Sequence, residues 1–143
     1  MDLAFGTHVR EHFYSIGRLT GVEADRVTHS VRSIVVSPEA SGDATSVRRP
    51  FGAVLADHFD GDIELRGFPE DPRTLRGDGI VTLTGETRLT KEGRDIGHLV
   101  GVEINPDTGE IVAIVGRHHW WTPRLHLKAS ALDFSHPGEI QMH

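Results

Sequence analysis

Residues 116–124, which read Gly-Arg-His-His-Trp-Trp-Thr-Pro-Arg, concentrate the side chains best suited to bind a partner. They hold both tryptophans of the chain, a histidine pair and two arginines: Arg117, His118, His119, Trp120, Trp121 and Arg124. Tryptophan and arginine are favoured at binding hot spots because each buries a large area and still presents a polar group. We predict that these six residues bind a partner. The alternative is that one tryptophan fills the core, or the seam between two units, and that the loop only closes the chain.

Histidine raises the question of a metal site, since the chain has 10 histidines and no cysteine. Several lie near acidic residues in the second half of the sequence: His118, His119, His126, His136, Asp133 and Glu139. Zinc needs three or four converging ligands, and no His-Glu-x-x-His spacing occurs. In a strand, the adjacent His118 and His119 would point to opposite faces. We therefore expect no metal and no cofactor, and keep a metal- or small-ligand-binding protein as the third alternative.

Sequence patterns of catalytic sites are missing. Residues 57–62, Asp-His-Phe-Asp-Gly-Asp, are rich in carboxyl groups, but general acid catalysis requires a carboxyl group in an apolar pocket. A polar turn before a strand explains this segment more simply. No Gly-x-Ser-x-Gly elbow, cysteine nucleophile or glycine-rich phosphate loop occurs. We predict that the chain is not an enzyme.

The elements that position these residues are indicated by an internal repeat. Residues 16–23, Ile-Gly-Arg-Leu-Thr-Gly-Val-Glu, recur at 96–103 as Ile-Gly-His-Leu-Val-Gly-Val-Glu. The same register continues on both sides of this match. We predict a first unit at 1–67, a second at 78–143, and a connector rich in proline and charge at 68–77.

Each unit reads as β rather than α structure. Alternating and β-branched apolar residues predict strands at 21–25, 31–36, 99–104, 111–115, 125–127 and 140–142. Asn-Pro-Asp-Thr-Gly at 105–109 predicts a turn, and short helical turns are expected within 51–56 and 128–132. Glycines within strands typically mark bulges or tight bends, and the repeat contains four: Gly17, Gly21, Gly97 and Gly101. The predicted fold is all-β, with two tandem small barrels related by internal duplication.

Glu23 and Glu103 occupy equivalent positions of the repeat. We expect each on an exposed face of its strand. The alternative is that they face the seam and accept hydrogen bonds from backbone donors across a pseudo-twofold axis.

Composition limits the classes of partner. The chain has 15 basic and 21 acidic residues, a formal net charge of −6, which disfavours general attraction to nucleic acid or to an anionic bilayer. The sequence shows no signal peptide and no apolar run of the roughly 20 residues that a spanning helix requires. We expect a cytoplasmic protein without membrane insertion. Whether two copies pair is left open.

The pattern Ile-Gly-x-Leu-x-Gly-Val-Glu at 96–103, followed by Asp-Thr-Gly at 107–109 and Ile-Val-Ala-Ile-Val at 111–115, resembles the PRC-barrel superfamily. Residues 122–132 and 139–142 are similar to that family's closing strands. The family includes the cytoplasmic domain of the photosynthetic reaction-centre H subunit and the C-terminal domain of a ribosome-maturation factor. The resemblance covers almost all of the second unit and, more weakly, the first.

This resemblance implies a six-stranded, barrel-like fold that makes protein or ribonucleoprotein contacts without catalysis. The first hypothesis is therefore a non-catalytic adaptor that docks onto a larger complex through 116–124 and the adjoining strands. The second is a ribosome- or RNA-associated maturation factor, which would contact nucleic acid only through a ribonucleoprotein.

Overall fold

The computed structural model describes residues 1–11, 14–38, 46–55, 61–66, 79–119, 121–136 and 138–142. In these residues the chain forms β-strands and two short 3-10 turns, and the prediction of an all-β chain is confirmed. No helix in this described part is long and apolar enough to span a bilayer. The predicted connector, 68–77, lies outside the described residues.

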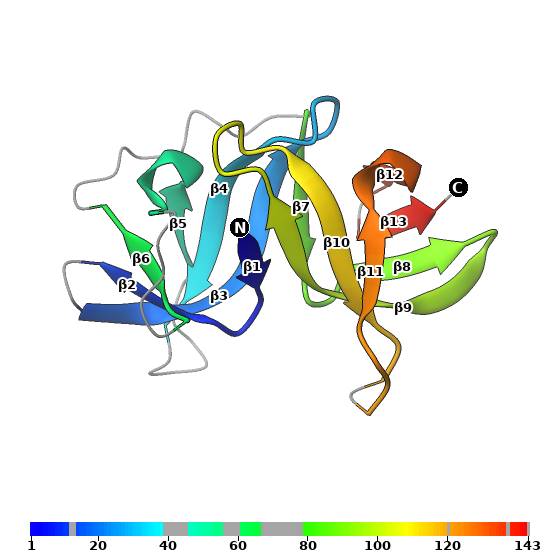
Figure 1. Cartoon of the computed structure of the whole chain (residues 1–143), viewed down its shortest axis with the longest axis horizontal. Helices are drawn as coiled ribbons and strands as arrows, with labels where there is room; N and C mark the ends of the chain where they lie inside the picture. The colour runs from blue at the N-terminus through cyan, green and yellow to red at the C-terminus, as the bar shows by residue number, and fades with distance from the viewer. Residues whose placement is uncertain are drawn as a thin grey trace.

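The strands form two sheets that lie side by side (Figure 1). The N-terminal sheet contains β2 (His8–Glu11), β3 (Tyr14–Asp25), β4 (Val31–Ser37), β5 (Val47–Pro50), β6 (Ile63–Leu65) and β7 (Ile80–Thr84). The C-terminal sheet contains β1 (Asp2–Ala4), β8 (Arg88–Lys91), β9 (Arg94–Ile104), β10 (Ile111–Arg117), β11 (Leu125–Lys128), β12 (Leu132–His136) and β13 (Glu139–Met142). In each sheet one pair is parallel, β2 with β6 and β8 with β13, and the other pairs are antiparallel.

Each predicted unit contributes its first strand to the sheet of the other. Strand β1 pairs with β9, so that Leu3 lies opposite Val102, and β7 pairs with β3, so that Leu83 lies opposite Val22. Figure 1 shows β1 and β7 between the two sheets. Because Leu3 and Leu83 are almost fully buried, each sheet depends on a strand from the other half for part of its core.

The two halves also meet directly through their β3–β4 and β9–β10 turns. Val31 N–H donates to Gly109 O over 2.8 Å, and Ile111 N–H donates to His29 O over 2.9 Å. Val31 and Ile111 are 80 residues apart, as are Gly109 and His29, so these two hydrogen bonds are reciprocal. The same offset relates the pairing of β1 with β9 to that of β7 with β3.

The two halves share one apolar core. Buried side chains from both sheets, among them Leu19, Ile34, Leu99 and Ile114, belong to a single continuous cluster. A shared cluster of this kind favours cooperative unfolding of the two halves, because opening one exposes apolar surface of the other.

The four repeated glycines all lie next to irregularities of strand pairing. The β2–β3 and β8–β9 ladders shift register beside Gly17 and Gly97, respectively. The β3–β4 and β9–β10 ladders shift register beside Gly21 and Gly101. These bulges bend the long strands β3 and β9, and the bend carries each strand from one set of neighbours to the next.

Closed barrels are not seen among the described strands, in contrast to the predicted barrels. Instead, the ends of each sheet are joined along the chain by a 3-10 turn. The turn η1 (Phe51–Ala53) follows β5 and leads to Val54, which bridges to Leu65 of β6. The turn η3 (Ala129–Ala131) follows β11 and leads to β12, which pairs with β13.

Candidate functional site

The described members of the predicted binding set lie on the hairpin formed by β10 and β11: Arg117, His118, His119, Trp121 and Arg124. These strands are antiparallel, and their last pair before the loop joins Gly116 to Leu125. The loop projects away from the rest of the molecule (Figure 1). A projecting hairpin is accessible to a partner from several sides. We refer to residues 116–125 as the binding hairpin.

An exposed aromatic stack occupies the tip of the binding hairpin. The rings of His119 and Trp121 are 4.5 Å apart at their centroids and 8° from parallel. The His118 ring lies 4.1 Å from that of His119 in a tilted arrangement. Trp121 is 66% exposed, so it does not fill the core; Trp120 lies outside the described residues. The stack therefore presents a largely exposed aromatic surface at the tip.

Thr122 holds the tip in shape. Its hydroxyl accepts a hydrogen bond from His119 N–H over 3.0 Å and donates one to His119 O over 2.8 Å, while its own N–H donates to the same carbonyl over 3.0 Å. His118 and His119 lie in a bend beyond the end of β10, so the alternation of side chains along a strand does not separate them. Preformed loops of this kind lose less entropy when a partner binds.

The two arginines of the predicted site have different surroundings. Arg117 ends β10 opposite His98 and is partly buried. Arg124 is exposed and lines a small pocket of about 120 Å³ against β1 and β9, together with Asp2 and His126. The guanidinium of Arg124 is therefore the more accessible of the two.

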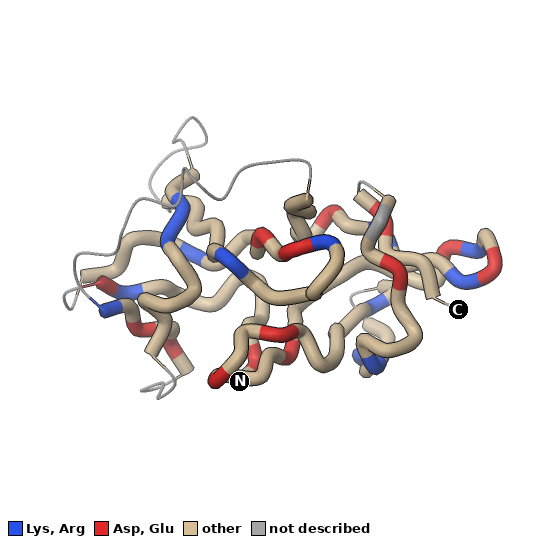
Figure 2. Tube along the Cα trace, turned by 90° about the horizontal axis from the view of Figure 1, so that it is seen from above, with Lys and Arg blue, Asp and Glu red and all other residues tan. Residues whose placement is uncertain are grey.

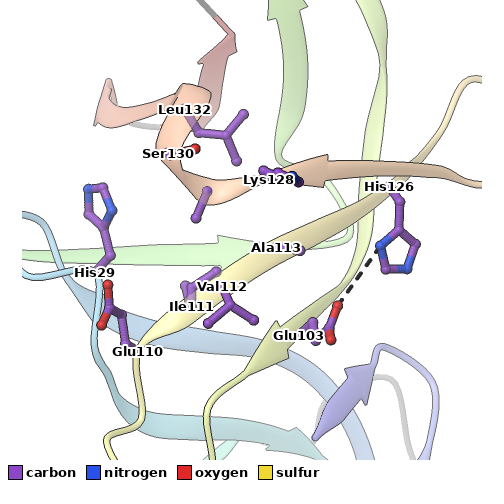
Figure 3. Close-up of a pocket in the computed structure, with 11 residues that line it drawn as sticks. His29, Glu103, Glu110, Ile111, Val112, Ala113, His126, Lys128, Ser130 and Leu132 are labelled. Carbon is purple, nitrogen blue, oxygen red and sulfur yellow. Dashed lines mark ion pairs between the residues drawn. The ribbon is translucent and has the colours of Figure 1, made fainter.

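A larger pocket, of about 620 Å³, is also lined by His126 of β11, and no sequence pattern indicated it. Its lining is apolar at Ile111, Val112, Ala113, Ala129 and Leu132, and polar at His29, Glu103, Glu110, His126, Lys128 and Ser130. In Figure 3, Glu103 and His126 lie at one end and His29 and Glu110 at the other, with the β10 side chains between them. The pocket is broadly open to solvent, and we call it the β11 pocket.

The turn that carries His29 is shaped by Asp25. The Asp25 carboxylate accepts hydrogen bonds from Val27 N–H and Thr28 N–H, at 2.8 and 2.9 Å. These backbone donors, that of Thr28 first, hold the pKa of Asp25 below its usual value. The turn places His29 in the left-handed region, at φ 59°. Its ring then packs edge-on against Phe134, with 4.5 Å between centroids.

Glu23 and Glu103 differ sharply in their surroundings, although they hold equivalent positions. Glu23 is buried; its carboxylate accepts from Arg48 Nε at 2.7 Å and from the Ser33 hydroxyl at 2.8 Å. The prediction of an exposed position is wrong for Glu23, and its partners are side chains rather than backbone donors. Glu103 is partly exposed and lies 3.9 Å from His126 Nδ1 in the β11 pocket. Glu23 and Arg48 are 25 residues apart, so no local sequence pattern indicated this ion pair.

Replacement of Glu23 by glutamine will destabilise the fold more than the same replacement of Glu103. E23Q removes the charge that faces Arg48, and we expect a loss of about 1–3 kcal/mol in the free energy of unfolding, moderated because Arg48 is one-third exposed. E103Q breaks only a solvent-exposed contact, and we expect a change below about 0.5 kcal/mol. Urea denaturation of the two variants checks this; equal losses would contradict the difference between the two sites.

Histidines and carboxylates do not gather into a metal site in the described part of the chain, where no three of them are placed to share an ion. His136 Nε2 lies 3.7 Å from Asp133 Oδ2, and His126 is near Glu103.

Neither a scan of protein-family models nor a search of curated proteins found a match to this chain.

Proposed function

We propose that this chain is a non-catalytic protein-interaction module that docks onto a larger assembly through the binding hairpin. The observation that carries the proposal is the exposed His119–Trp121 stack, held by Thr122 at the tip of a projecting hairpin. A large, rigid aromatic surface exposed to water is unfavourable for a free protein, and burial against a partner would recover that free energy. Arg124 and the two histidines would supply the polar rim.

We further propose that the halves are two PRC-barrel-like units related by duplication. Two features support this proposal: the repeat at 16–23 and 96–103, and the 80-residue offset between their strand pairings. After a duplication, both units retain the strands of the sheet, whereas the loops between strands can diverge. The β4–β5 loop of the first half corresponds to the β10–β11 loop of the second. Trp121 lies in the β10–β11 loop, one of the loops that can diverge.

The charge distribution favours a protein partner over direct binding to RNA. An aromatic stack of this kind also suits a nucleic-acid base, which is the observation in favour of a ribosome- or RNA-associated factor. However, RNA binding relies on a continuous basic surface. Figure 2 shows acidic and basic residues interspersed along the described parts of the trace, and the net charge is −6.

Substitution of Trp121 by alanine will greatly reduce partner capture without loss of stability. We expect W121A to recover at least about 10-fold less of the partner that the wild-type chain captures from its host, because an aromatic hot spot contributes about 2 kcal/mol or more. Val27, 85% exposed in the β3–β4 turn, provides the control variant V27A, which should capture the partner normally. Thermal unfolding should show little change for either variant.

Nuclease treatment of the same captures separates the two partner classes. A protein partner stays bound after RNA is digested, whereas a ribosome-associated factor loses its captured material. Equal recovery by W121A and the wild type would count against the hairpin as the docking site.

A further inference from the structure

The β11 pocket exists because corresponding positions of the two sheets hold residues of different size. Ser33 lies opposite Pro50 in the N-terminal sheet, and Ala113 lies opposite Lys128 in the C-terminal sheet. The next residue begins the 3-10 turn in each case, Phe51 in η1 and Ala129 in η3. Phe51 and Ala129 therefore occupy the same place in their sheets.

In the N-terminal half the phenylalanine ring fills this place. The ring packs against the core and against Gly109, and a Cβ added to Gly109 would lie 3.3 Å from two ring carbons. The residue that corresponds to Gly109 in the other turn is His29. On that side Ala129 carries only a methyl group, and the space bounded by His29, Ala129 and Leu132 belongs to the β11 pocket. The Phe51 ring in the N-terminal half therefore indicates that an aromatic ring fits the space beside Ala129 in the C-terminal half.

A second difference concerns charge. In the N-terminal half Glu23 pairs with the guanidinium of Arg48 at 2.7 Å. In the C-terminal half the residue corresponding to Arg48 is His126, whose Nδ1 is 3.9 Å from Glu103 and whose side chain is 65% exposed. Glu103 therefore lacks the close cation that its counterpart has. With histidines neutral, the carboxylates of Glu103 and Glu110 outnumber the single ammonium of Lys128 in the lining.

We propose that the β11 pocket binds an aromatic ring that carries a cationic group. The ring takes the place that Phe51 fills in the other half, over the apolar floor formed by Ala113 and Ala129. The cation pairs with Glu103, as Arg48 pairs with Glu23. A volume of about 620 Å³ is within the range of small-ligand pockets. This site is separate from the aromatic stack at the hairpin tip, and the proposal does not depend on docking by that stack.

Phenethylamine is a suitable probe, with binding followed by chemical-shift changes of the Ala113, Ala129 and Leu132 amides in two-dimensional NMR spectra. We expect saturable shifts with phenethylamine. Binding of 2-phenylethanol, which has the ring without the charge, should be about 5-fold weaker, the difference expected for a partly exposed ion pair. Butylamine, which has the charge without the ring, should give no saturable shift.

Variants that introduce residues of the N-terminal half at the corresponding positions of the C-terminal half test where the ring and the cation bind. A129F fills the space for the ring and should weaken phenethylamine at least about 10-fold, as loss of one main contact does. H126R supplies a guanidinium to Glu103 and should weaken phenethylamine at least about 5-fold, as removal of the charge from the ligand does. The double variant H29G/A129F reproduces the Gly109–Phe51 arrangement and provides a folded alternative if A129F is crowded. W121A should bind phenethylamine normally, which separates this result from the test of the hairpin.

The source of the ring is distinguished by a peptide. If acetyl-phenylalanyl-lysine amide binds more tightly than phenethylamine, the aromatic cation belongs to a segment of a protein partner. If it binds more weakly, the ligand is a free aromatic amine. The proposal is overturned if phenethylamine gives no saturable shift at the pocket amides. It is also overturned if H29G/A129F and H126R both bind phenethylamine as the wild type does.

Discussion

Replacement of Gly17 by alanine will lower the free energy of unfolding by about 3–5 kcal/mol, an effect large enough to unfold a marginally stable domain. Gly17 has φ 141°, a conformation that residues with a side chain rarely adopt. A Cβ at this position would overlap the carbonyl oxygen of Ser37 on β4. Because the atoms that the added Cβ meets are backbone atoms of Ser37 and Pro38, the clash cannot be relieved by a side-chain rotation, and the β3–β4 pairing must shift.

Gly97 should respond in the same direction but less strongly. Its φ is 143°, and an added Cβ would lie 2.7 Å from Arg117 O at the end of β10. Urea denaturation monitored by circular dichroism measures both variants. Gly85→Ala is the matched control, since Gly85 has no atoms within 4 Å of the added Cβ and no positive φ. A G17A variant as stable as G85A would contradict the close approach of β3 and β4 at this bulge.

Replacement of Leu3 by alanine will cost about 2–5 kcal/mol, the range for a leucine removed from a packed core. Leu3 is fully buried on a strand of only three residues, Asp2–Ala4. A short strand at the start of a chain would ordinarily fray, and a substitution there would have little effect. The expected cost therefore depends on the pairing of β1 with β9, the strand of the opposite half.

The corresponding residue in the other exchanged strand is Leu83, and L83A should cost a similar amount. Asp2→Ala changes an exposed position of the same strand as Leu3 and should alter stability by less than about 0.5 kcal/mol. Amide hydrogen exchange offers a second readout, because L3A should lower the protection of β9 amides as well as that of β1. Stability of L3A equal to that of D2A would show that β1 does not contribute to the core.

The location of the strands, turns and bulges could be predicted from the residues because short-range geometry decides them. Alternating apolar residues at 99–104 and 111–115 and the Asn-Pro-Asp-Thr-Gly turn predicted the β9–β10 pair, and those strands are present. Glycine within a strand predicts a bulge or tight bend where a side chain would clash, and the ladders shift register beside Gly17, Gly21, Gly97 and Gly101.

The aromatic hairpin was recognisable as a candidate from its residue types, but the exposure of Trp121 was not. Sequence alone left open whether a tryptophan filled the core, because residue type does not decide whether a loop folds over its sheet or projects from it. The projection of the β10–β11 hairpin and the stacking on His119 place Trp121 in solvent.

Three other features were decided only by the tertiary structure, because each depends on residues that are distant in the sequence. The exchange of β1 and β7 between sheets follows from their burial against β9 and β3, and a three-residue strand such as β1 carries too little pattern to specify its partner. The burial of Glu23 depends on Arg48, which comes two strands later. The β11 pocket depends on Ala129 standing across from His29 of the other half. Local sequence thus determined which segments are strands and where they bend, whereas packing between distant segments determined which strands pair, which acid is buried and where a cavity remains.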